Sequence, residues 1–297
     1  LRPNPKPRVC VIGAGAIGME FASFYATLGT RVTVLEAAPR VLPAGDEEVS
    51  AFVRQSMEKA GIQFLTGASL AAGQAHEDDV GLVVEHAGAD KELRAERVLV
   101  AVGLVGNTDG LGLAQTRVTM RNGLIETGDW GLTTEPGVYA IGDVAGAPML
   151  AHKASHDGIA CVEHIAGLRA GPQRHARIPS CVYSHPQSAS IGLTEAQARQ
   201  SERRVRVGRF PLEGNGKAIA IDEAAGFIKT VFDEATGELL GAHLVGPEAT
   251  ELVHGYTLAA TLEATEAELM DTVFPHPTLS EAMHEAVLAA YGRALHL

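Results

Sequence analysis

Residues 8–18 of the chain read Arg8-Val9-Cys10-Val11-Ile12-Gly13-Ala14-Gly15-Ala16-Ile17-Gly18. The apolar run from Val9 to Ile12 predicts a buried strand, and apolar residues recur at helical spacing over residues 21–28. Between strand and helix, the first glycine permits a tight turn, the second lets a pyrophosphate approach the backbone, and the third lets helix and strand pack closely. Because a helix N-terminus attracts phosphate, this segment predicts a dinucleotide site.

A second predicted strand ends in an acidic residue. Residues 31–35 are Arg-Val-Thr-Val-Leu, and Glu36 follows them, 18 residues after Gly18. A carboxylate at this point can accept hydrogen bonds from both ribose hydroxyls and repels a 2′-phosphate, which favours NAD over NADP. A surface Glu at a strand end is the alternative, and the register favours the ribose contact.

Composition excludes several classes of partner. The 297 residues suffice for two domains and a smaller third segment, and 46% hydrophobic with 20% charged residues is typical of a globular enzyme. The net charge of −12 and the lack of a basic cluster argue against nucleic acid. We expect no membrane partner, since no apolar run approaches the roughly 20 residues that span a bilayer and no secretory signal opens the sequence.

The cysteines and the first residues place the chain in a reducing compartment and within a longer protein. The three cysteines are scattered: Cys10, Cys161 and Cys181. No pair has the spacing of a disulfide framework or a zinc site, so no metal is expected. The chain begins with Leu1 rather than Met, and three prolines precede the first strand. We expect this start to be an interdomain linker.

Periodicity predicts a doubly wound first region and a different last region. A helix capped by Asp46 precedes a strand at 62–65, which completes β-α-β-α-β. Further strands are expected at 81–86 (in an antiparallel ribbon), 97–102, 124–127, 138–141, 181–183, 205–210, 227–232 and 239–245. Helices are expected through 159–165 and over 250–262 and 280–295. Strands followed by helices indicate an α+β domain, so we predict an α/β Rossmann-like region 1–104, a segment 105–175 and an α+β region 176–297.

An aspartate follows one of these strands. Asp143 comes after Tyr139-Ala140-Ile141-Gly142, at the edge where α/β sheets bind ligands. Its carboxylate could accept a hydrogen bond from a cofactor hydroxyl, and Met149 to His152 begin a helix beyond it. A turn or helix-cap role for Asp143 is an equal alternative.

A histidine near the C-terminus lies between two prolines. This placement holds the backbone of His276 extended. Glu281, five residues on, could orient the imidazole and stabilise its protonated form. Thr278-x-x-Glu281 is also a capping box. The spacing favours capping, and the two roles are compatible.

These motifs, in this order, resemble the dihydrolipoamide dehydrogenase family, which are flavin- and NAD-dependent disulfide oxidoreductases. The resemblance covers essentially all of the chain, and His276 to Glu281 are its most specific part. It implies that residues 105–175 are the tail of an FAD-binding domain and that residues 176–297 form an interface domain. It implies the following cofactor-binding residues: Gly13, Gly15 and Gly18 at the NAD pyrophosphate, Ile17 and Glu20 near the nicotinamide, Glu36 at the adenosine ribose, Leu70 at the adenine, Gly103 on the returning strand, Asp143 at the FAD ribityl chain, and Met149, Leu150, Ala151 and His152 along the flavin.

The resemblance also implies a reaction and partners. His276 would be the acid/base that takes a proton from dihydrolipoamide, and Glu281 would orient it. The family is a homodimer in which this histidine reaches the other subunit's active site. Its further partners are a lipoyl domain and the E2 component of a 2-oxoacid dehydrogenase complex. The expected location is the bacterial cytoplasm or, alternatively, the mitochondrial matrix.

The chain departs from the family pattern in one respect. The family's first segment, with the FAD pyrophosphate turn and a C-x-x-x-x-C redox disulfide, has no counterpart in this sequence. We therefore expect a fragment that is inactive alone, because electrons pass through that disulfide. Alternatives are an NAD-binding, dimerising module without turnover, or a related flavin disulfide reductase or transhydrogenase. An NADPH-dependent glutathione reductase would place Arg where Glu36 stands.

Overall fold

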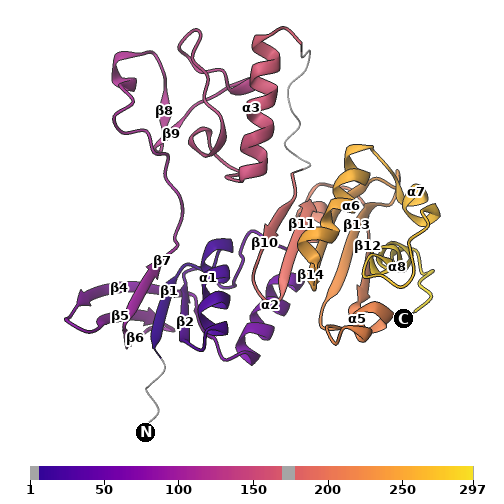
Figure 1. Cartoon of the computed structure of the whole chain (residues 1–297), viewed down its shortest axis with the longest axis horizontal. Coiled ribbons are helices and arrows are strands. Elements are labelled where there is room, and N and C mark those ends of the chain that lie inside the picture. The colour runs from indigo at the N-terminus through magenta and orange to yellow at the C-terminus, as the bar shows by residue number, and fades with distance from the viewer. Residues whose placement is uncertain (1–6, 169–177, 297) are drawn as a thin grey trace. The chain divides into compact units, whose positions relative to one another are not determined.

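The computed structural model describes residues 7–168 and 178–296 of the chain (Figure 1). They form two compact units, the first made of Leu1–Val102 and Pro179–Leu297 and the second of Gly103–Ile178. The division into three regions stays a prediction. In the described ranges, no helix is both long and apolar enough to cross a membrane.

The first unit begins with the predicted β-α-β-α-β arrangement. Its elements are β1 (Arg8–Ile12), α1 (Ala16–Thr27), β2 (Arg31–Glu36), α2 (Glu47–Lys59) and β3 (Gln63–Thr66). The strands are parallel in the order β3-β2-β1-β7, and β7 (Arg97–Val100) is the returning strand (Figure 1). This order brings the ends of β1, β2 and β7 to one edge of the sheet, which confirms the doubly wound prediction.

Helix α2 begins as predicted. The Glu48 N–H donates to Asp46 Oδ1 over 3.1 Å, so Asp46 caps the first turn. Val49, Val53 and Met57 face the core at helical spacing.

A three-stranded antiparallel ribbon follows. It consists of β4 (Ala68–Ala75), β5 (Val80–His86) and β6 (Ala89–Ala95). The predicted ribbon strand is β5, which alternates between buried and partly exposed residues over part of its length. Strands β4 and β6 were not predicted, because most of their residues are exposed and carry no clear apolar alternation.

The rest of the first unit is a five-stranded antiparallel sheet with helices. Strand order is β10-β11-β14-β13-β12 (Figure 1). The elements are β10 (Ser180–Val182), β11 (Gln187–Gly192), α4 (Glu195–Gln200), β12 (Val205–Pro211), α5 (Gly216–Ala220), β13 (Phe227–Asp233), β14 (Leu239–Gly246), α6 (Ala249–Thr261), α7 (Glu266–Asp271) and α8 (Glu281–Ala290). Tyr256 of α6 is fully buried, and its hydroxyl donates to the Met283 carbonyl over 2.8 Å, which ties α6 to α8.

The parallel sheet and the five-stranded sheet of this unit share a hydrophobic core. Val182, Phe227 and Val245 of the antiparallel sheet pack with the buried residues of the parallel sheet and its helices. The Phe52 ring of α2 meets Phe227 edge-on, with ring centroids 5.8 Å apart. Burial of apolar surface therefore holds these parts together.

The predicted strand at 138–141 is wrong. In the second unit, Tyr139 makes an isolated antiparallel bridge with Leu132, and residues 142–145 form a short 3-10 helix. An extended segment becomes a strand only where another strand pairs with it. The predicted strand at 124–127 is shortened to β9 (Leu124–Ile125), paired with β8 (Met120–Arg121). The predicted helix is α3 (Ala151–Ile165).

The predicted helix at 280–295 is too long at its C-terminal end. Helix α8 stops at Ala290, and Gly292 takes a positive φ of 66° while the Gly292 N–H bonds to the Ala289 carbonyl. A glycine in this conformation ends a helix at little cost.

Candidate functional site

The glycine turn lies at the carboxyl end of β1. A Cβ on Gly13 would lie 2.3 Å from the Ala101 carbonyl oxygen, and one on Gly18 would lie 1.9 Å from the Gly13 carbonyl oxygen. Neither position can therefore carry a side chain. At Gly15, by contrast, nothing lies within 4 Å of where a Cβ would be, and no side chain caps α1. Because no side chain caps α1 and there is room at Gly15, the start of this helix suits a pyrophosphate.

Glu36 at the end of β2 is held beside this turn. Its Oε2 accepts from the Ala14 N–H over 2.6 Å, and its Oε1 accepts from the Ala38 N–H over 2.7 Å. Two backbone donors fix the carboxylate, which keeps lone pairs for further donors such as ribose hydroxyls. The glycine turn and Glu36, which were predicted separately, are thus joined by the hydrogen bond from the Ala14 N–H.

Ile17 and Glu20 lie on the first two turns of α1. The Ile17 side chain is exposed. Glu20 Oε1 accepts from the Tyr183 N–H over 2.9 Å, and one turn later Ser23 Oγ accepts from the His185 N–H over 2.9 Å. Sequence reasoning missed Tyr183 and His185, whose N–H groups attach α1 to the segment after β10.

Leu70 and Gly103 make no hydrogen bond with the glycine turn among the described residues. Leu70 is an exposed residue of β4 at a register shift in the ribbon. Gly103 follows β7 with a φ of 131° and begins the second unit. Its neighbours Ala101 and Val102 are the residues against which Gly13 packs.

The predicted flavin residues lie in the second unit. Asp143 is exposed in the 3-10 helix 142–145, and its carboxylate makes no hydrogen bond to any described residue. It therefore remains available as an acceptor. Met149 and Leu150 precede α3, and Ala151 and His152 begin it.

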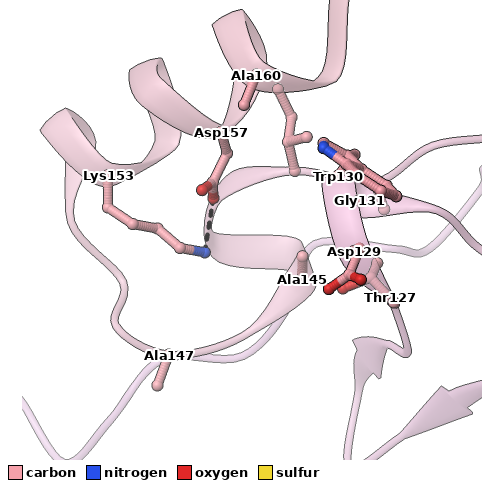
Figure 2. A pocket seen from close by; sticks show the side chains of 12 residues that line it. Thr127, Asp129, Trp130, Gly131, Ala145, Ala147, Lys153, Asp157 and Ala160 are labelled. Carbon is pink, nitrogen blue, oxygen red and sulfur yellow. Dashed lines mark ion pairs between the residues drawn. The ribbon is translucent and has the colours of Figure 1, made fainter. Parts of the chain in front are cut away.

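The second unit also contains a cavity that the sequence did not reveal. It has a volume of about 360 Å³ and is lined by residues 127–131, by parts of 140–147 and by one face of α3 (Figure 2). Lys153 and Asp157 form an ion pair there, with Nζ and Oδ2 2.8 Å apart. None of the predicted site residues lines the cavity.

His276 and Glu281 form a hydrogen-bonded pair in the first unit. His276 Nδ1 lies 2.9 Å from Glu281 Oε1, and the His276 side chain is 78% exposed. A carboxylate accepts only, so the neutral ring carries its proton on Nδ1 and leaves Nε2 as an accepting atom. This arrangement can move a proton at Nε2.

Glu281 performs half of the predicted capping box as well. Its Oε2 accepts from the Thr278 N–H over 2.9 Å, while the Thr278 hydroxyl donates to the Pro275 carbonyl. The residue at the N-cap of α8 is Ser280, so the Thr278 half of the box is wrong. Partial burial alone would raise the pKa of Glu281, but hydrogen bonds from Thr278 and His276 outweigh it and lower the pKa.

Most of the predicted residues thus form three groups, outside which Ile17, Glu20, Leu70 and Gly103 lie. The glycine turn and Glu36 are joined by hydrogen bonds and close packing, and so are His276 and Glu281. Asp143 and residues 149–152 belong to the second unit. All three cysteines are free thiols, and burial raises the pKa of Cys10 to about 11.

Comparison with known proteins identifies two family regions. Residues 1–158 match the pyridine nucleotide-disulphide oxidoreductase family, and residues 178–287 match the dimerisation domain of that family. Dihydrolipoyl dehydrogenase of Zymomonas mobilis is 52% identical over 100% of this chain and 64% of its own length. Dihydrolipoyl dehydrogenase of Bacillus subtilis is 42% identical over 97% of this chain and 61% of its own length.

Solved structures agree with these relatives. LpdA of Mycobacterium tuberculosis superimposes with a TM-score of 0.88 at 27% identity, over 95% of this chain and 61% of that protein. The HOCl-induced flavoprotein disulfide reductase RclA of Escherichia coli gives a TM-score of 0.86 at 25% identity, over 96% of this chain and 65% of that protein. The chain spans less than two thirds of the length of each of these relatives. With a family match over more than half of its residues, the chain belongs to the pyridine nucleotide-disulphide oxidoreductase family.

Proposed function

We propose that the chain is the NAD-binding, flavin-contacting and dimer-forming part of a dihydrolipoamide dehydrogenase. The observation that carries the proposal is the His276–Glu281 pair, with Nδ1 and Oε1 2.9 Å apart and Nε2 left to accept a proton. Curated relatives 42–52% identical to the chain are dihydrolipoyl dehydrogenases, which supports the same activity.

The residues present fit NAD and one part of an FAD site, which is incomplete in this chain. The open space at Gly15 and the uncapped start of α1 would receive the NAD pyrophosphate, and Glu36 would bind the ribose hydroxyls. Asp143 is exposed, and its carboxylate, which makes no hydrogen bond to a described residue, would accept from the FAD ribityl chain. When bound, FAD supplies the electron transfer between the thiols of the substrate and NAD.

Three residues of the chain would account for proton transfer, orientation of the histidine and selection of NAD. Nε2 of His276 would take the proton of a dihydrolipoamide thiol, since the thiolate rather than the thiol reacts. Glu281 would hold the ring in the Nδ1–H tautomer and stabilise the imidazolium that forms. Glu36 would exclude a 2′-phosphate by charge and so select NAD.

We propose a homodimer as the form in which His276 works. A groove of about 860 Å³ runs between α6, α7 and the segment before α8, and its wall includes Leu258, Leu262 and Val273. Val273 is 92% exposed in the single chain. A second copy would cover this apolar surface, and the match to a dimerisation domain supports that occupant. A lipoyl domain and an E2 component remain the proposed further partners, and the bacterial cytoplasm or mitochondrial matrix the proposed location.

A second function suits the chain by itself. Its three cysteines are free thiols, and none is spaced as a redox pair. Without that disulfide, electrons cannot pass to lipoamide by the family's route. Alone, the chain would then be an NAD-binding, dimer-forming module.

A visible spectrum and an NADH titration of the purified chain test whether the chain by itself is such a module or turns over. A colourless protein that binds NADH and does not oxidise it with lipoamide is the module. Flavin bands with lipoamide-dependent NADH oxidation would overturn the module. Failure to bind NADH at all would refute the assignment of the glycine turn.

A further inference from the structure

The position of His276 depends on the backbone that carries it. Its ring is largely exposed and makes one hydrogen bond, to Glu281. Contacts of the ring itself therefore do little to place it. The His276 loop, residues 275–280, must supply the precision that a proton transfer requires.

Asn215 holds this loop from outside. It is buried, 5% exposed, and precedes the short helix α5. Its Oδ1 accepts from the Ala218 N–H over 2.9 Å, and its Nδ2 donates to the Thr278 carbonyl over 3.0 Å. Among the described residues that belong to neither the loop nor α8, Asn215 is the one whose side chain makes a hydrogen bond to the loop backbone.

The Asn215 contact leads to the imidazole through two further hydrogen bonds. The Thr278 N–H donates to Glu281 Oε2 over 2.9 Å, and Glu281 Oε1 meets His276 Nδ1 at 2.9 Å. Thr278 is thus held at its carbonyl by Asn215 and at its N–H by Glu281. We propose that Asn215 is a positioning residue for His276, acting through Thr278 and Glu281.

The anchor itself is well fixed. The Leu212 N–H donates to the Gly226 carbonyl over 3.0 Å, and the Asn215 N–H donates to the Leu212 carbonyl over 2.9 Å. At Gly214, a Cβ would lie 2.6 Å from the His296 carbonyl oxygen. The segment 212–215 is therefore bonded to Gly226, the residue before β13, and packed against His296, so its position is fixed where it contacts the loop.

Two substitutions separate positioning from capping of α5. Asn215→Asp and Asn215→Ser both keep an oxygen that accepts from the Ala218 N–H. Both lose the amide Nδ2 that donates to the Thr278 carbonyl; Asp places a repulsive charge there, whereas Ser is uncharged and one atom shorter. Asn107→Asp, an exposed position in the second unit, is the control for the same chemical change elsewhere.

The test reads the tautomer of His276 by ¹⁵N NMR of the histidine-labelled chain at a pH where the ring is neutral. His276→Gln assigns the signal, and Glu281→Ala shows the signature of a broken pair. We expect the parent and Asn107→Asp to show the Nδ1–H form. Asn215→Asp and Asn215→Ser should move toward the mixture seen in Glu281→Ala. Unchanged ring signals in both variants would overturn the proposal.

The consequence for turnover rests on the proposed function. In a flavin-containing enzyme that includes this chain, both Asn215 variants should lower dihydrolipoamide oxidation about tenfold, because a displacement of about 1 Å can cost up to about 10²-fold. Reduction of the flavin by NADH should stay unchanged. Altered NMR signals without a loss of turnover would leave Asn215 as a positioning residue and refute the catalytic role of His276.

Discussion

Replacement of Lys229 by Met is expected to lower the free energy of unfolding of the first unit by about 3 kcal/mol. Lys229 projects from β13, and its side chain is 3% exposed. Its Nζ lies 3.2 Å from Asp46 Oδ2, 2.7 Å from Glu48 Oε1 and 2.7 Å from Glu195 Oε2. One buried cation therefore joins the start of α2 to the antiparallel sheet.

The expected loss of stability follows from how far each of the three carboxylates is left uncompensated when the Lys229 charge is removed. Asp46 is as buried as Lys229, so its charge would be left uncompensated, a situation that costs about 3–5 kcal/mol. The Glu48 and Glu195 side chains are 46% and 25% exposed and have Arg209 and Arg199 as second partners, so they add little. Met is close to the lysine stem in volume, which keeps any cavity small. The lower end of the range is therefore expected.

Urea unfolding followed by far-ultraviolet circular dichroism at pH 7 measures this loss. Asp46→Asn is the matched partner, because Asn caps a helix as well as Asp does and removes only the charge. In a double-mutant cycle, Lys229→Met should cost at least about 2 kcal/mol less in the Asp46→Asn background. A coupling below about 0.5 kcal/mol would refute the claim that the buried charge pair, rather than the packing of the stem, carries the effect.

Three further outcomes test the site and the charge cluster. Burial alone would raise the pKa of Asp46 and of Glu195, but nearby charges and hydrogen bonds outweigh burial and lower both pKa values. The stability that the two carboxylates contribute is therefore present at neutral pH and is lost as the pH falls through the lowered pKa values. The urea midpoint of the parent should drop on acidification more than that of Lys229→Met. Glu36→Arg should weaken NADH binding relative to NADPH by about 10- to 100-fold in fluorescence titrations, because charged hydrogen bonds to the ribose are lost. An unchanged preference between NADH and NADPH would contradict the role of Glu36. In a flavin-containing enzyme, His276→Gln should lower lipoamide turnover by roughly 10²–10⁴-fold while NADH still reduces the flavin, and an equal fall in both half-reactions would exclude the acid/base role.

Local sequence patterns correctly predicted the strand, glycine turn and helix of residues 8–27. The strand, the glycine turn and the helix follow one another within residues 8–27, so each element is specified by residues close to it in sequence. Asp46 was found as a helix cap for the same reason. Its contact with Lys229 was not found, because the two residues are 183 positions apart and no local signal announces a tertiary ion pair.

The strand expected at 138–141 shows what local sequence patterns cannot predict, namely whether another strand is present to pair with it. Its apolar residues satisfy the composition of a strand, yet strand formation is decided by a neighbour that supplies backbone donors and acceptors. Among the described residues of the second unit, its pairing is limited to one isolated bridge, between Leu132 and Tyr139, with backbone hydrogen bonds from Ala140 to Gly131 and from Thr133 to Val138. The position of Asp143 therefore depends on a turn and a 3-10 helix rather than on a sheet edge.

Glu281 shows that capping and orientation of a histidine are not competing explanations. A carboxylate has two oxygens, and here Oε2 accepts from the Thr278 N–H while Oε1 meets His276. The same loop geometry that begins α8 thus fixes the tautomer of the ring. Because one side chain serves both purposes, a substitution at Glu281 perturbs the loop and the imidazole together. Asn215 contacts Thr278 and not His276, so a substitution at Asn215 changes the loop while the Glu281 side chain itself is kept, and this separates the two contributions.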